Sequence, residues 1–228
     1  MDLTNIAMDT YRVISTVIGV LYILVFIAGF LSIAYAVDDS DYLTKSQLKS
    51  NKINKAAFFQ FLMAILYIGI AILLYPILRI YNESLAIGFL STRIIAVVFV
   101  LIGTITLLLI LKLSQEYVKF NSSGLTYYNL IGDLLKAVRD LVNHVGMIIM
   151  LCIGGIILFI IMIQSALIPT WLSVWGIVGS VIAILASILV LRKNLQILSP
   201  TYMMLNIPVA LQEIAFAAWL ILKGFKQD

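Results

Sequence analysis

Residues 141–191 read LVNHVGMIIMLCIGGIILFIIMIQSALIPTWLSVWGIVGSVIAILASILVL, and these 51 residues include no Asp, Glu, Lys or Arg. A transmembrane helix needs about 20 predominantly apolar residues, so this stretch is too long for one crossing and has the length of two. Polar residues and a proline near its middle are typical of a turn: Gln164, Ser165, Pro169 and Thr170. We therefore predict two membrane spans, over about 144–168 and 170–191.

Four further apolar stretches of similar length surround this pair, at about 13–37, 56–78, 84–111 and 202–222. At about 1.5 Å per residue, each is long enough to cross a hydrocarbon core about 30 Å thick. The sequence therefore predicts an all-α, polytopic membrane protein. We expect a single transmembrane domain over 1–228, built as a bundle of six transmembrane helices.

The composition supports this class. Of the 228 residues, 63% are hydrophobic and 11% are charged, and the mean hydropathy is +1.11. A soluble domain has roughly 45–50% apolar and about 25% charged residues, so a soluble globular protein is excluded. The net charge of +4 comes from Lys and Arg scattered at the ends of apolar stretches, without a basic face, so we expect membrane lipids and no nucleic acid as partners. Nothing in the sequence indicates an oligomeric state.

An amphipathic helix is predicted at about 125–143, between the third and fourth spans. Apolar residues recur there at steps of three and four: Leu125, Tyr128, Ile131, Leu134, Leu135, Val138, Leu141 and Val142. The polar positions opposite carry charges of both signs, which argues against an arm that binds strongly anionic lipid. Two placements stay open: the helix lies in the interface, or it extends the fourth span into water.

The positive-inside rule predicts the orientation. On the side of the termini, Lys and Arg number four: Arg12, Arg79, Lys223 and Lys226. On the other side they number ten: Lys45, Lys49, Lys52, Lys55, Lys112, Lys119, Lys136, Arg139, Arg192 and Lys193. We therefore expect a protein of the cell membrane with both termini extracytoplasmic and the three longer connections in the cytoplasm.

Two groups of residues are similar to a known family. The first is Leu74-Tyr75-Pro76-Ile77-Leu78-Arg79 with Asn82, Leu85, Ala86 and Arg93; the second is Pro208, Glu213, Trp219-Leu220 and Lys223-Gly224-Phe225. The turn Leu167-Ile168-Pro169 followed by Trp175-Gly176 fits as well. Together they resemble the prokaryotic multi-pass membrane family catalogued as domain of unknown function 4386. The resemblance implies the membrane fold and the importance of these positions, and it implies no chemistry. The family pattern often has an acidic residue one turn after the arginine, where this chain has Ala96 and Val97.

Arg93 and Glu213 are single charges inside predicted spans. A charge at mid-membrane costs at least ~2.5 kcal/mol on insertion scales, so such residues normally face the bundle interior and find a partner. Counted at about 1.5 Å per residue, both lie roughly 13–15 Å from the same membrane face. We expect them to meet as a buried charge pair, with Tyr22, Tyr67 and Ser180 at similar depth completing a polar cluster.

His144 is expected to lie at the cytoplasmic interface, at the start of the fourth span, where a polar ring is solvated. The alternative is a proton relay with Asp140, which lies one helical turn earlier on the same face. One histidine and one cysteine, Cys152, leave no paired metal motif, and nucleophile and phosphate-loop motifs are absent, so we expect no metal, no cofactor and no catalytic residue. The glycines at 154, 155, 176 and 179 predict close helix packing.

Three functions agree with these features. The favoured one is small-molecule or ion handling, by transport or ligand sensing, around Arg93 and Glu213. The second is a non-catalytic membrane accessory or interaction protein in which the pair is structural. The third, an intramembrane enzyme acting on lipid, is the least favoured because the chain offers one histidine and no nucleophile motif.

Overall fold

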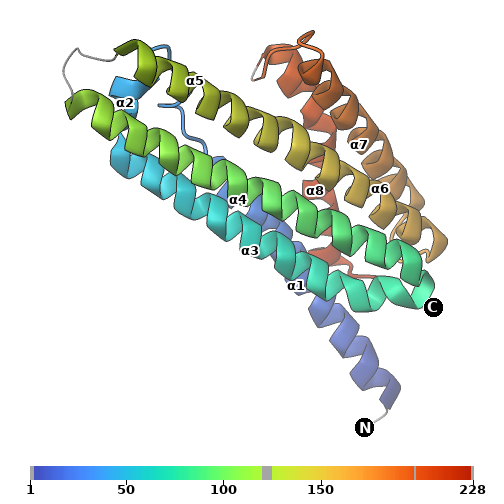
Figure 1. Ribbon diagram of the computed structural model, residues 1–228. Coiled ribbons are helices and arrows are strands. Elements are labelled where there is room, and N and C mark those ends of the chain that lie inside the picture. The colour runs from blue at the N-terminus through green and yellow to red at the C-terminus, as the bar shows by residue number, and fades with distance from the viewer. Residues whose placement is uncertain (1–2, 120–124, 198, 227–228) are drawn as a thin grey trace.

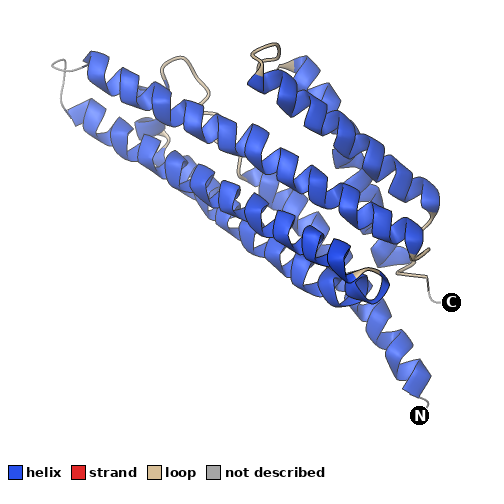
Figure 2. Ribbon diagram, turned by 45° about the vertical axis from the view of Figure 1, so that its right-hand side comes forward, coloured by secondary structure: helices blue, strands red, loops and turns tan. Residues whose placement is uncertain are grey.

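The computed structural model describes residues 3–119, 125–197 and 199–226, and within these ranges the chain is helical and has no strand (Figures 1 and 2). The helices are α1 (Leu3–Leu31), α2 (Tyr42–Leu48), α3 (Ser50–Tyr81), α4 (Glu83–Lys119), α5 (Leu125–Leu141), a π-helical turn η1 (Val142–Gly146), α6 (Met147–Gln164), α7 (Thr170–Leu191) and α8 (Pro200–Leu222).

Within the described residues, six segments are long and apolar enough to cross a membrane: Tyr11–Leu31, Ser50–Tyr81, Glu83–Lys119, Thr126–Gln164, Thr170–Leu191 and Pro200–Leu222. This confirms the prediction of an all-α fold with six transmembrane helices. The fifth span has the predicted bounds, 170–191. The turn before it begins after Gln164, and Ala166 adopts a left-handed backbone conformation with φ of 51°.

The first span is shorter than predicted. α1 ends at Leu31, whereas the uncharged stretch continues to residue 37. Ala34, Ala36 and Val37 are buried in a cluster with residues of α2, α3 and α4. The absence of charge after Leu31 therefore reflects packing inside the protein, which a hydropathy pattern does not distinguish from contact with lipid.

The predicted amphipathic segment extends the fourth span. α5 continues through η1 into α6, so the chain is helical from Leu125 to Gln164. Of the two placements left open by the sequence, the structure has the extension and not a separate interfacial helix. One face of α5 lies against α4, where the rings of Tyr117 and Tyr128 meet edge to face with centroids 5.9 Å apart. Packing against α4 therefore explains part of the apolar face that the sequence shows over 125–143.

α2 and the ends of α3, α4 and α5 form a second packed region away from the termini (Figure 1). α4 alone has 37 residues, so it is about 55 Å long and exceeds a hydrocarbon core of about 30 Å. Here the Tyr42 hydroxyl donates to an Asp133 carboxylate oxygen at 2.9 Å, and the Lys136 ammonium lies 5.2 Å from the Tyr42 ring centroid. Burial and the Asp133 carboxylate raise the pKa of the Tyr42 phenol.

At the opposite end, Arg12 of α1 holds the C-terminus of α8. Its guanidinium donates to the carbonyl oxygens of Ile221 at 2.8 Å and Leu222 at 3.1 Å. A cation at a helix C-terminus also balances the negative end of the helix dipole. The chain then turns at Gly224, whose φ of +75° suits glycine, and the Lys226 amide donates to the Leu167 carbonyl at 2.8 Å.

Several glycines allow close helix contacts, as the sequence predicts. At Gly19 of α1, an added Cβ would lie 2.7 Å from the Ala217 carbonyl oxygen of α8, which is backbone and cannot turn aside. At Gly155 of α6, it would lie 3.1 Å from the Ser180 hydroxyl of α7. At Gly69 of α3, the nearest atom is 3.8 Å away on Leu21, an ordinary contact.

Replacing Gly19 by alanine is therefore expected to destabilise the protein by roughly 1–3 kcal/mol, because α1 and α8 must separate to accept the methyl group. Gly69→Ala is the matched control and should be neutral or stabilising by up to about 1 kcal/mol, since it removes backbone freedom inside a helix without a clash. Reversible unfolding in mixed micelles measures both. Equal effects of the two changes would contradict the close contact between α1 and α8.

Candidate binding site inside the bundle

Arg93 is buried in the first third of α4, with 2% of its surface exposed. It lies ten residues after Glu83, the first residue of α4, and so about 15 Å along the helix. Its guanidinium carbon is 5.6 Å from the Tyr67 ring centroid and 5.3 Å from that of Phe89. Cation–π contacts of this kind stabilise a desolvated guanidinium by about 2 kcal/mol, which offsets part of the cost of burying it.

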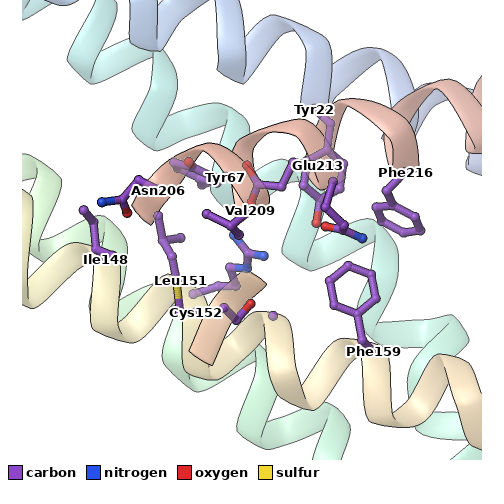
Figure 3. Close-up of a pocket in the computed structure, with 14 residues that line it drawn as sticks. Tyr22, Tyr67, Ile148, Leu151, Cys152, Phe159, Asn206, Val209, Glu213 and Phe216 are labelled. Atoms are coloured by element: carbon purple, nitrogen blue, oxygen red, sulfur yellow. The ribbon is translucent and has the colours of Figure 1, made fainter. Parts of the chain in front are cut away.

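A cavity of about 100 Å³ lies beside this guanidinium (Figure 3). Its lining includes all five residues that the sequence placed at one depth: Tyr22, Tyr67, Arg93, Ser180 and Glu213. Each comes from a different helix: α1, α3, α4, α7 and α8. The structure therefore brings together around one cavity the residues singled out from charge, polarity and depth.

The direct contact expected between Arg93 and Glu213 is absent. Among the described residues, no ion pair within 4.0 Å joins the two, and the Nε and Nη1 atoms of Arg93 have no hydrogen-bond partner. The guanidinium lies instead near the Tyr67 and Phe89 rings. Counting residues along a helix gives the depth of a side chain in the membrane but not the direction in which it points. The sequence therefore predicted that Arg93 and Glu213 share a depth, but not that their charged groups stay out of contact.

Aromatic rings line the cavity on the side of the termini. Phe216 packs edge to face against Tyr22 and against Phe159, with ring centroids 5.5 Å apart in both pairs. In Figure 3 Phe159 and Phe216 lie on the right-hand side of the cavity, and Asn206 and Ile148 lie on the left.

Asn206, Gln212 and Cys152 also line the cavity and were not singled out. Asn206 and Gln212 carry a usable signal, since they are polar positions within the same apolar span as Glu213. Cys152 carries none, because an isolated cysteine in an apolar stretch reads as an ordinary core residue.

A second cavity, of about 460 Å³, lies farther from the termini. Its lining mixes apolar side chains with polar and charged ones around Arg139, among them Asp38, Asn143 and His144, which hydropathy did not reveal. The Arg139 Nη1 atom is 2.9 Å from an Asp38 carboxylate oxygen and 3.3 Å from one of Asp140. The Gln60 Oε1 atom and the Arg139 Nε atom, both buried, have no hydrogen-bond partner among the described residues.

The alternative relay between Asp140 and His144 is not formed. No hydrogen bond or ion pair within the described part of the chain joins them, and Asp140 contacts Arg139 instead. The His144 Nδ1 atom lies 3.3 Å from the Tyr202 hydroxyl, and the His144 carbonyl accepts hydrogen bonds from Ser187 and Tyr202. His144 lies in η1, and a π-turn interrupts the regular helical ladder, so residues four apart no longer face the same way.

No three His, Cys, Asp or Glu side chains of the described ranges are grouped as a metal site requires. Among known proteins, the family model described as Domain of unknown function (DUF4386) matches residues 17–224. No curated protein and no solved structure gives a significant match.

Proposed function

We propose a function from the cavity itself, because the chain belongs to the family described as Domain of unknown function (DUF4386), as its resemblance to that family predicted. We propose that the protein binds a small polar solute between Arg93 and Glu213, in order to transport or to sense it. The observation that carries this proposal is a buried guanidinium whose Nε and Nη1 atoms lack protein partners and which lines a cavity. Buried polar groups are almost always hydrogen-bonded, so this exception points to a ligand or bridging water.

The chemistry of the lining indicates the class of solute. Guanidinium donors form a planar fork that matches a carboxylate. Glu213 lines the same cavity without contacting Arg93, and it would accept from an ammonium group. A solute with both groups would balance both the buried Arg93 and the half-buried Glu213. Since one water needs roughly 10–15 Å³, a cavity of about 100 Å³ has room for a molecule of only a few non-hydrogen atoms. We therefore propose a small zwitterion of the size of glycine.

Thermal unfolding of the purified protein in detergent tests this proposal with glycine, acetate and methylammonium as probes. Glycine should raise the unfolding temperature more than either half-molecule. At about 100 times the dissociation constant, binding adds roughly 2.7 kcal/mol of stability. Arg93→Met should remove the glycine effect, and Arg79→Met, at an exposed arginine in the last turn of α3, should retain it.

A glycine effect that is missing from the wild-type protein, or unchanged in Arg93→Met, would contradict the proposal. Loss of stability in Arg93→Met without any ligand effect would favour the accessory role, in which the buried charges are structural. The lipid-acting enzyme gains no support, because Asp140 and His144 do not converge.

We further propose that both termini are extracytoplasmic in the cell membrane. The six spans put the start of α1 and the end of α8 on one side, and Arg12 joins these two helix ends (Figure 1). The excess of Lys and Arg on the other side favours the cytoplasm for α2 and α5.

In a background with Cys152 replaced by serine, a cysteine introduced at Lys226 should react with an impermeant maleimide on intact cells, and one introduced at Lys49 should not. Both positions are exposed, so accessibility within the protein does not limit either reaction. The reverse labelling pattern would overturn the orientation and leave the six spans unaffected.

A further inference from the structure

The two cavities lie one beyond the other along the same helices. On each of α1, α3 and α4, a residue that lines one cavity lies seven positions from a residue that lines the other: Tyr22 and Gly29, Tyr67 and Gln60, and Arg93 and Val100. Seven residues are about two turns, or about 10 Å along a helix. Because α3 runs opposite to α1 and α4, all three pairs place the 460 Å³ cavity farther from the termini.

The two linings adjoin on the remaining helices. On α6, Met147 lines the larger cavity and the next residue, Ile148, lines the smaller one. On α8, Met203 lines the larger cavity, and Asn206, one turn closer to the termini, lines the smaller one. In Figure 1 the pair α7 and α8 diverges from α3, α4 and α5 with distance from the termini.

Toward the termini, packed aromatic rings border the smaller cavity. Phe216 packs on Tyr22 and Phe159, and beyond these rings α1 and α8 are in contact at Gly19 and Ala217. A solute approaching from the side of the termini would have to separate both layers.

We propose that the 460 Å³ cavity is the entry site of the Arg93 cavity, so that a solute reaches Arg93 only from the end of the bundle that carries α2. Ligand pockets commonly have volumes of 300–1,000 Å³, and this one offers an incoming zwitterion free polar atoms of both kinds. Both Gln60 and Arg139 line the cavity. The Gln60 Oε1 atom, which has no hydrogen-bond partner among the described residues, would accept from an ammonium group, and the Arg139 Nε atom, which also has none, would donate to a carboxylate. The identity of the solute rests on the proposed function, whereas the route rests on the two cavities.

Cys152 provides the test, because it is the single cysteine of the chain and lines the inner cavity with 5% of its surface exposed. The reagent is 2-aminoethyl methanethiosulfonate, which forms a mixed disulfide with the thiol and releases methanesulfinate. Mass spectrometry follows the rate in folded protein in detergent, where both ends of the bundle meet the reagent. Met203, which is 56% exposed, lines the larger cavity one turn from Asn206, so Met203→Trp adds a large ring to the lining next to the smaller cavity. Met204 is 69% exposed and lines neither cavity, so Met204→Trp is the matched control.

We expect Met203→Trp to slow labelling of Cys152 at least tenfold and Met204→Trp to leave the rate within twofold of wild type. Equal rates in the two variants would overturn the route, as would a wild-type thiol that reacts only after unfolding in SDS. Glycine stabilisation is measured on the same samples. Slowed labelling without a glycine effect would retain the route and refute the proposed ligand, so the two failures are distinguishable.

Discussion

Replacing Arg93 by methionine is expected to destabilise the bundle by roughly 3–5 kcal/mol, because it leaves the Glu213 carboxylate in the bundle interior without its balancing charge. Glu213→Gln should also destabilise the protein, since it leaves the guanidinium uncompensated. Coulomb's law at an effective dielectric constant of 20 gives about 4 kcal/mol for charges 4 Å apart. The two charges are farther apart than that, so their coupling should be smaller.

A double-mutant cycle read by reversible unfolding in mixed micelles measures this coupling. The double variant should lose less stability than the sum of the single variants. Arg79→Met serves as the control for removal of an arginine at an exposed position, where effects usually stay within about 0.5 kcal/mol. Strictly additive losses would show that the two residues are energetically independent despite their shared cavity.

Replacing Arg139 by methionine should cost roughly 2–3 kcal/mol. Its side chain is 8% exposed and contacts both Asp38 and Asp140, which would otherwise face each other as like charges. The expected loss is below that of a fully buried pair because the carboxylate side chains are 23% exposed and partly solvated.

Lys112→Met provides the comparison for this prediction. Lys112 contacts Glu116 at 2.9 Å, a geometry like that of Arg139 and Asp38, but the lysine side chain is 65% exposed. Exposed pairs contribute about 0–1 kcal/mol, so this change should have little effect on unfolding in mixed micelles. Similar losses from the two replacements would mean that burial does not govern the strength of the Arg139 contacts.

Particular residues show how far sequence reasoning reached in the candidate site. Charge inside an apolar stretch identified Arg93 and Glu213, and counting residues from the span ends added Tyr22, Tyr67 and Ser180, all of which line one cavity. The same reasoning missed Arg139, because it lies in a helix whose polar face reads as solvated. Sequence reasoning also offered a proton relay between His144 and Asp140, because it assumed a regular helix where the chain forms a π-turn.

The sequence by itself determined the six spans, the fold class and the common depth of the buried polar residues. These properties follow from one dimension, because the thickness of the hydrocarbon core sets span length and helical rise converts residue number into depth. Tertiary structure alone decided that α1 ends at Leu31, that Arg93 and Glu213 stay apart, and that two cavities adjoin at Met203 and Asn206. The direction of each side chain and the divergence of the helices depend on neighbours distant in sequence, and no local pattern encodes them.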